Sequence, residues 1–413
     1  MAVAGLHHVG AVRSRSTVTG AIVAQMSQAV GSFLLQVQAA RLLGREGLAE
    51  FAVLYGLVVV GTAVSTGLVG DALTVLDRHS SPVRAGLQWW ASRVVLVAAV
   101  VLALTVLAVG GLGAVDVLWF ALATATFLVE DLLRRLLMAS MRFWTIVAVD
   151  LVVLVGSVGL VAAVHLGPGT VSLQTFLIAM VVGQSAAAVT AWAMLPPADR
   201  RWVRGVVPER ATVWRYGSWR ALQHSIRPVT LALVRVVAIA LIGLAAFGEV
   251  EAARLFVAPA ILAVNGASNY LFASFANSST ATTPDLLRRA DRGVAALLGA
   301  ALALGFVAVV TLPLLGDLVA VGEFEISALA VAGWSAFAAA TAAVTPYGVL
   351  AAVRVRQAKV FTIRAIETVA SIGAVAMVLA SGADGWTIPV VLGLCSAVAG
   401  WAIRVAIVAE DSP

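Results

Sequence analysis

The chain has 413 residues, of which 61% are hydrophobic and only 12% are charged, so a water-soluble protein is excluded because its exterior must be largely polar. The formal net charge of +6 could suggest a nucleic-acid partner. The arginines, however, fall in short connections between long apolar runs, a pattern that indicates membrane topology rather than nucleic-acid binding. Composition therefore predicts an all-α, polytopic membrane protein without a soluble domain.

About twelve apolar runs are long enough to cross a bilayer, whose hydrocarbon core takes roughly 20 residues of helix. In chain order, they begin near Thr17, Ala49, Gln88, Asp116, Arg142, Val171, Tyr216, Glu251, Gly293, Ser327, Lys359 and Trp386. The first run is too long and too rich in glutamine for a signal peptide, so we expect a retained span. We predict two pseudo-symmetric lobes of about six helices each around a central cavity.

The connections between these runs alternate in charge. With the N-terminus inside, the cytoplasmic connections collect most arginines, whereas the outside connections hold Arg41 and Arg45 but otherwise only acids. This alternation predicts that both termini are cytoplasmic. The longest and most basic connection, residues 195–215, would join an N-terminal lobe (1–194) to a C-terminal lobe (216–413).

No motif in the sequence indicates an enzyme. There is no Walker loop, no GxSxG elbow and no dinucleotide fingerprint. The single cysteine, Cys395, lies in an apolar run, and the five histidines show no ligand spacing beyond the adjacent pair His7 and His8. We therefore expect no catalytic residue, no metal and no cofactor.

The fourth run carries four charges at its cytoplasmic end, namely Glu130, Asp131, Arg134 and Arg135. Their spacing allows i,i+4 pairs on one helix. We interpret them as a solvated or interfacial salt-bridge cluster rather than as part of a binding site.

The seventh run begins with YGSWRALQHSIRPVTLALVRVV, residues 216–237. At 100° per residue, its Arg220, His224, Arg227 and Arg235 fall within an arc of about 80°. An arginine at the centre of a span costs about 2.5–3.5 kcal/mol, whereas a leucine returns only about 0.5 kcal/mol. The stripe should therefore face the bundle interior or a water-filled cavity.

Other readings of the stripe stay open at this point. Arg220 could reach the membrane interface, and His224 could be packed without a functional role. Arg227 precedes Pro228, so residues 216–226 could form an amphipathic surface helix.

Charges in other spans are further candidates for the lining of a path. They are Asp150 in the fifth run and the Arg364/Glu367 pair in the eleventh. Arg235 could instead form a structural ion pair with an acid such as Asp150 or Glu367. The i,i+3 spacing also favours a private ion pair between Arg364 and Glu367.

The two halves of the chain contain a weak internal repeat. Sliding the chain by 199 residues places residues 40–51 over 239–250, with Gly44 over Gly243. The same shift brings three glutamines of the first run onto the basic stripe of the seventh. They are Gln25, Gln28 and Gln36, which meet His224, Arg227 and Arg235. Polar positions thus coincide in both halves, as in transporters built from repeats.

The link ARLLGREGLAEFAVLYG resembles that between the first two spans of oligosaccharide flippases in the multidrug/oligosaccharidyl-lipid/polysaccharide exporter superfamily. The matching residues are Ala40, Arg41, Leu43, Gly44 and Phe51, whereas Leu48 and Ala49 replace the family's aromatic-glycine pair. The second half supplies that pair as Phe247-Gly248, followed by EAARLFVAP. With the twelve-span plan, the resemblance covers nearly the whole chain.

The resemblance implies a flippase of the bacterial inner membrane that moves a polyprenyl-pyrophosphate-linked glycan outward by alternating access. Membrane lipids and glycan-assembly enzymes are candidate partners. Arginine matches phosphate oxygens in a bidentate way, so a cationic cavity would suit this substrate. The candidate lining consists of Arg235, Arg227, Arg220, His224, Gln25, Gln28, Gln36, Asp150, Arg364 and Glu367.

Two other functions remain as alternatives. A cation-coupled drug exporter of the same superfamily would have a similar fold, although the basic stripe does not favour cation binding. A membrane-embedded glycan polymerase or ligase usually carries a large external loop, and the outside connections here are short.

Overall fold

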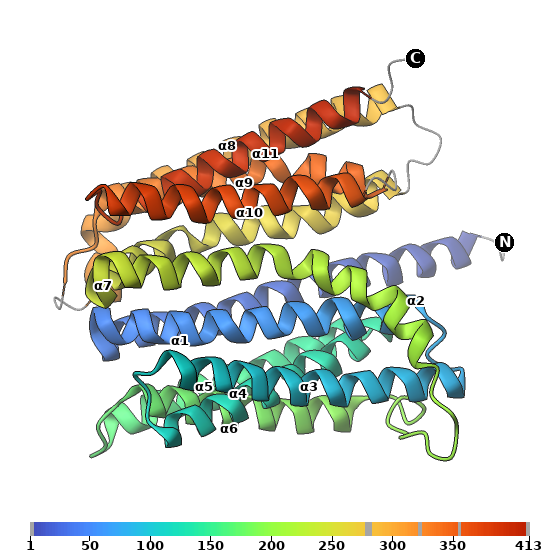
Figure 1. The fold of residues 1–413 in the computed structure, drawn as a ribbon. Coiled ribbons are helices and arrows are strands. Elements are labelled where there is room, and N and C mark those ends of the chain that lie inside the picture. Colours follow the sequence, from blue (N-terminus) through green and yellow to red (C-terminus); the bar gives the residue numbers. More distant parts are fainter. Residues whose placement is uncertain (1–3, 277–282, 321–323, 354–356, 410–413) are drawn as a thin grey trace. The chain divides into compact units, whose positions relative to one another are not determined.

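The computed structural model describes residues 4–276, 283–320, 324–353 and 357–409, and within these ranges it contains helices and no strand (Figure 1). In chain order, the elements are α1 (Ala4–Ser65), the π-helix η1 (Thr66–Gly70), α2 (Asp71–Val75), α3 (Ser81–Val109), α4 (Ala114–Ala139), α5 (Phe143–Leu166), α6 (Leu173–Met194), α7 (Arg210–Ala276), α8 (Thr283–Ala320), α9 (Ala328–Val353), α10 (Gln357–Ala380) and α11 (Thr387–Ala409). The predicted all-α fold is confirmed.

Nine helices in the described ranges are long and apolar enough to cross a membrane. Two of these spans, Val23–Val75 and Arg210–Leu262, have 53 residues each and are broken by a kink. Each therefore holds two of the expected runs. Helix α4 is not among the nine because it carries charges near both ends, but it has 26 residues. Counting it and both halves of each kinked helix recovers the expected twelve segments of the described chain.

Both kinks occur at glycine. Gly44 in α1 has φ 65°, and Gly243 in α7 has φ 82°, a left-handed backbone region that side chains disfavour. A Cβ on Gly243 would meet nothing within 4 Å, so conformation rather than space requires glycine there. Because the internal repeat pairs these two positions, both halves bend at the equivalent residue.

The chain forms two compact units, and each unit consists of two separate segments of the sequence. Unit 1 contains Met1–Gln38 and Leu54–Pro228, and unit 2 contains Ala39–Val53 and Val229–Pro413. The bend of α1 thus belongs to unit 2, and the first part of α7 belongs to unit 1. Each unit is described below by itself.

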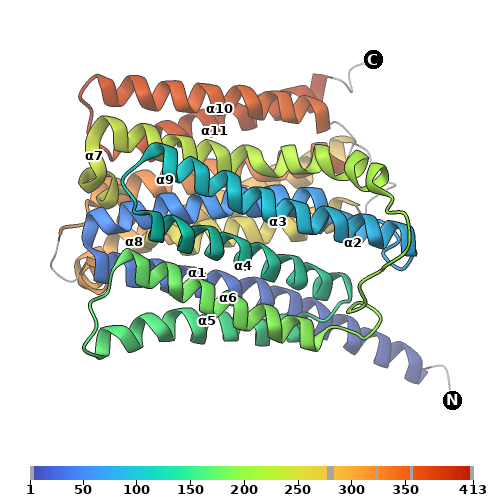
Figure 2. The same cartoon turned by 60° about the horizontal axis from the view of Figure 1, so that its bottom comes forward.

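In unit 1, α4 packs against α3, α5 and α6 (Figure 2). Glycines allow two close approaches in this unit. Gly156 of α5 lies against the backbone of Gly183 in α6, and Gly217 of α7 lies against the backbone of Leu68 in η1. The second approach places the beginning of α7 directly on the π-helix. Such π-turns are often found at functional sites.

In unit 2, α9 packs against both α8 and α11. The core contains Phe247, Trp334 and Phe337, and the indole Nε1 of Trp334 donates a hydrogen bond to the carbonyl of Val250 at 2.8 Å.

Many large apolar side chains outside the core are exposed, among them Phe306 and Leu314 of α8. An exterior of this kind fits lipid rather than water.

Candidate functional site

The predicted basic stripe is divided between the units. Arg220, His224 and Arg227 lie on the part of α7 that belongs to unit 1, whereas Arg235 belongs to unit 2. Its members are therefore described as two separate groups.

The first group joins α7 to α2 within unit 1. An Nη2 of Arg220 lies 2.7 Å from Oδ2 of Asp71, and Nε2 of His224 lies 3.0 Å from the same oxygen. The side chains are 34%, 37% and 20% exposed for Arg220, His224 and Asp71. We call these three residues the open acid–base group. A ligand could reach the guanidinium of Arg220 and the imidazole of His224. In this structure, both groups contact the carboxylate of Asp71.

The local fold explains this geometry. Asp71 is the first residue after η1, and the extra backbone of a π-turn changes the direction of the side chains that follow it. A Cβ on Gly67 of η1 would overlap the backbone of Ala221, so α7 approaches η1 as closely as it can. This contact brings Arg220 and His224 over Asp71.

The second group lies inside unit 2. Nε of Arg235 is 3.1 Å from Oε1 of Glu251, and Nε of Arg254 is 2.7 Å from Oε2 of the same carboxylate. The side chains of Arg235 and Glu251 are only 13% and 3% exposed. Two guanidinium groups thus share one buried carboxylate.

The alternative of a structural ion pair for Arg235 is confirmed, but its acid is Glu251. Of the two acids that were named as examples, Asp150 pairs with Arg134 and Glu367 pairs with Arg364. Glu251 is distant from Arg235 in the sequence. The kink at Gly243 folds α7 so that its second arm brings Glu251 next to Arg235.

Arg227 and the three glutamines have diverse environments. Arg227 is half-buried in a part of α7 that stays helical through Pro228. Gln25 is exposed and Gln28 is half-buried. Gln36 is also half-buried, and its Nε2 donates to the carbonyl of Ser32 at 3.1 Å. The role of these four residues in a path stays a prediction.

The charges of α4 contradict the expected solvated cluster. Glu130, Asp131 and Arg134 are 3%, 1% and 4% exposed. Arg134 does not pair with Glu130, because its Nε lies 3.2 Å from Oδ1 of Asp150 in α5. Asp131 and Arg135 do form the expected i,i+4 pair at 2.7 Å. The cluster is buried because this end of α4 packs among the other helices of unit 1.

Asp150 is therefore at the centre of a buried network. It accepts from Arg134 and from the hydroxyl of Ser27, and Nη2 of Arg134 also donates to the carbonyl of Ala24 at 2.8 Å. The network ties α1, α4 and α5 together.

The predicted ion pair of α10 is confirmed. An Nη1 of Arg364 lies 2.6 Å from Oε2 of Glu367, and Ser396 of α11 donates to the other carboxylate oxygen at 2.6 Å. This arrangement supports the private pair rather than an unpaired cation.

Three charged partners were missed by the sequence analysis, namely Asp71, Glu251 and Arg254. Asp71 follows GLVG at the end of the second run, and Glu251 stands at the predicted start of the eighth. Acids at the ends of runs were assigned to connections, so only the contact of α7 with η1 and the bend of α7 at Gly243 reveal their partners.

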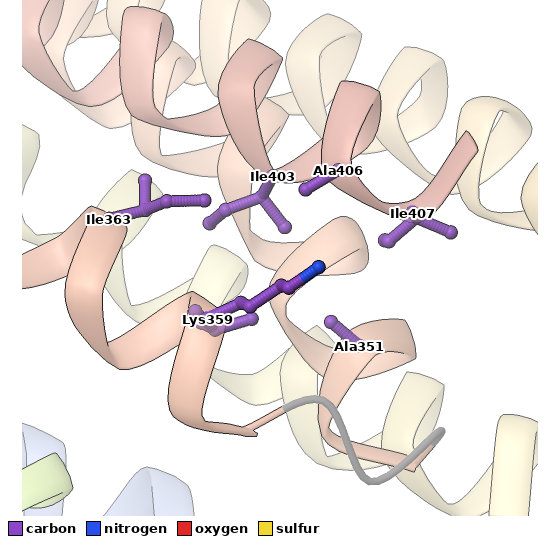
Figure 3. Close-up of a pocket in the computed structure, with 7 residues that line it drawn as sticks. Ala351, Lys359, Ile363, Ile403, Ala406 and Ile407 are labelled. Carbon is purple, nitrogen blue, oxygen red and sulfur yellow. The ribbon is translucent and has the colours of Figure 1, made fainter. Parts of the chain in front are cut away.

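A small pocket lies between α9, α10 and α11 of unit 2 (Figure 3). Its lining is aliphatic apart from Lys359, the only lysine of the chain. Lys359 is therefore the only side chain of this lining that can donate a hydrogen bond. In the described part of the chain, no group of three His, Cys, Asp or Glu residues could hold a metal ion.

No family model and no curated protein matches this chain. Solved structures do resemble it. An inward-facing multidrug resistance transporter of the MATE family, in the MOP superfamily, is 14% identical, with a TM-score of 0.61 over 95% of this chain and 100% of its own. The outward-facing conformation of such a transporter is 11% identical, with a TM-score of 0.62 over 96% of this chain and 95% of its own.

A third solved structure is a MOP superfamily transporter from Pyrococcus furiosus. It is 13% identical, with a TM-score of 0.58 over 95% of this chain and 94% of its own. Its binding pocket is described as having reverse polarity, which was taken to suggest a different function for that protein. At these identities, the likeness shows the fold alone, which this chain shares with these transporter structures.

Proposed function

We propose that this chain is an alternating-access flippase that moves a polyprenyl-pyrophosphate-linked oligosaccharide outward across the bacterial inner membrane. The observation that carries the proposal is the open acid–base group, in which Arg220 and His224 share Asp71 at a partly exposed position. The fold supports a transport function, because similar chains include transporters in inward-facing and outward-facing conformations.

The chemistry of this group suits a pyrophosphate. Arginine can donate two parallel hydrogen bonds to phosphate oxygens, and a histidine adds a further donor. In this structure, Asp71 contacts both Arg220 and His224 and so limits the cost of holding the guanidinium away from bulk water. A pyrophosphate would displace Asp71 and bring more negative charge than the single carboxylate.

This exchange offers a way to bias the conformation. A ligand shifts a conformational equilibrium only by its differential affinity for the two states. The pairs Arg220–Asp71 and His224–Asp71 link α7 to α2, so a ligand that replaces Asp71 weakens that link. We infer that substrate binding loosens this part of unit 1. The glycan would follow a polar path, and the polyprenyl tail would stay in lipid.

The buried group of unit 2 has a secondary role in this proposal. Arg235 and Arg254 share Glu251, and the side chains of Arg235 and Glu251 are largely buried. A guanidinium held in a buried ion pair is less accessible to a ligand than one that is partly exposed. We therefore assign direct binding to Arg220 and His224 and a structural role to Arg235.

The test is translocation of a lipid-linked oligosaccharide in proteoliposomes. We expect transport by the wild type and at least about tenfold slower transport by Arg220→Ala, which corresponds to a rise of about 1.4 kcal/mol in the activation free energy of transport. Arg93→Ala is the matched control, because Arg93 of α3 lies on the ring of Trp89 instead. Absence of transport in the wild type would reject the function, and full transport by Arg220→Ala would reject the site.

A second candidate is a cation-coupled drug exporter. The observation in its favour is that the similar solved structures include multidrug resistance transporters. Uptake of a cationic fluorescent drug into proteoliposomes distinguishes the two functions. Drug transport by the wild type, unaffected by Arg220→Ala, would favour this candidate.

A further inference from the structure

The charges at the C-terminal end of α4 and their partner in α5 do not balance. They comprise three carboxyl groups and two guanidinium groups, contributed by Glu130, Asp131, Arg134 and Arg135 of α4 and by Asp150 of α5, and all but Arg135 are buried. Arg134 pairs with Asp150 at 3.2 Å, and Arg135 pairs with Asp131 at 2.7 Å. Each guanidinium therefore has its own carboxylate, and Glu130 is left over.

Glu130 is isolated in a way that the other members are not. It is 3% exposed, and its Oε1 is buried without a hydrogen-bond partner in the part of the chain that the structure describes. All four charged neighbours act on it electrostatically, and two of them, Asp131 and Asp150, repel a negative charge. The other elements at the cluster contribute the Ser27 hydroxyl of α1, which donates to Asp150, and Gly70 of η1, against the Arg135 side chain.

A buried carboxylate without a donor is costly, and such a group normally becomes neutral instead. With Glu130 ionised, the five groups would carry one excess negative charge, whereas one proton on its carboxyl makes the cluster neutral. The proton is also the smallest cation that could do this, and it needs no further ligands.

We propose that Glu130 is a proton-binding site, whose carboxyl carries one exchangeable proton while the Arg134–Asp150 and Arg135–Asp131 pairs are formed. A rearrangement that opens this end of α4 to water would let the carboxyl ionise and release that proton to solvent. This proposal concerns unit 1 alone and does not depend on the substrate proposed above.

Infrared spectroscopy of the purified protein at neutral pH tests it directly. A protonated carboxylic acid has a C=O stretching band that is separate from the carboxylate bands, and this band shifts in heavy water. We expect the band in the wild type and its loss in Glu130→Gln. Glu209→Gln is the matched control, because Glu209 is an exposed glutamate in the connection before α7, and its variant should keep the band.

Two further measurements keep the proposal testable if the Glu130→Gln variant fails to fold. Wild-type protein with heavy-isotope labels on glutamate carboxyls should show the band shifted, which assigns it to a glutamic acid rather than to Asp131 or Asp150. Glu130→Gln, a neutral isostere of the protonated acid, should keep the thermal midpoint of the wild type better than Glu130→Ala does. Absence of the band in the wild type, an unshifted band in the labelled protein, or its persistence in Glu130→Gln would overturn the proposal.

Discussion

Arg235 and Glu251 approach within 3.1 Å across the bend of α7, although they are 16 positions apart in the chain. The left-handed backbone of Gly243 lets the two arms of the helix meet, and the ion pair then connects them inside unit 2. Both side chains are largely buried. Breaking such a pair leaves a charge without compensation in a region of low dielectric, which typically costs about 3–5 kcal/mol.

We therefore expect Glu251→Gln to lower the free energy of unfolding by about 3 kcal/mol or more, since the amide cannot neutralise Arg235. The midpoint of thermal unfolding in detergent measures the effect. Glu249→Gln is the control, because it breaks the ion pair with Arg45, whose side chains are 50% and 35% exposed. An exposed pair contributes at most about 1 kcal/mol. Equal effects of the two substitutions would contradict this account.

A second prediction concerns the contact between Gly248 and the bend of α1. A Cβ on Gly248 would overlap the carbonyl oxygen of Arg45, so Gly248→Ala must push the two backbones apart. We expect a loss of stability of about 1–3 kcal/mol, as for other overpacked sites. Gly348→Ala provides the control, because a Cβ there meets nothing within 4 Å and alanine favours a helix by about 1 kcal/mol. If both variants were equally stable, the close approach would not matter.

The sequence predicts the secondary structure of this chain better than its ion pairs. Apolar length locates the twelve helical segments, since crossing a bilayer requires about 20 residues wherever a span occurs. The repeat also places Gly44 over Gly243, and both are kinked. The pair of Arg364 and Glu367 is predictable because i,i+3 contacts are set by the helix itself.

Contacts between helices could not be predicted in the same way. Arg134 has Glu130 within reach on its own helix, but it pairs with Asp150 of another helix. Whether Arg134 pairs with Glu130 or with Asp150 depends on how α4 and α5 pack. The helical periodicity of the sequence does not determine that packing. The burial of Glu130 has the same cause, because charges near the end of an apolar run look solvated until the neighbouring helices are known.

A third prediction tests the open acid–base group by removing its acid. Asp71→Asn eliminates the charge that now holds Arg220 and His224, so these two side chains become more available to an anion. An ion pair of this exposure contributes up to about 1 kcal/mol, so we expect inorganic pyrophosphate to bind up to about fivefold more tightly. Isothermal titration calorimetry measures the affinity.

Asp77→Asn is the matched control for this experiment. Asp77 is exposed and lies six positions further on, where its carboxylate accepts from the backbone N–H of His79. Its variant should bind pyrophosphate as the wild type does. Unchanged or weaker binding by Asp71→Asn would mean that Asp71 does not compete with the anion.

The last prediction separates a structural role of Asp150 from a role in a transport path. Asp150→Asn leaves Arg134, which is 4% exposed, beside a neutral amide, and we expect a loss of about 3–5 kcal/mol in stability. The double variant Arg134→Met/Asp150→Leu removes both charges and should be considerably more stable than Asp150→Asn alone. Thermal unfolding in detergent gives the comparison. If Asp150→Asn were as stable as the wild type but did not transport, Asp150 would act on the substrate rather than on the fold.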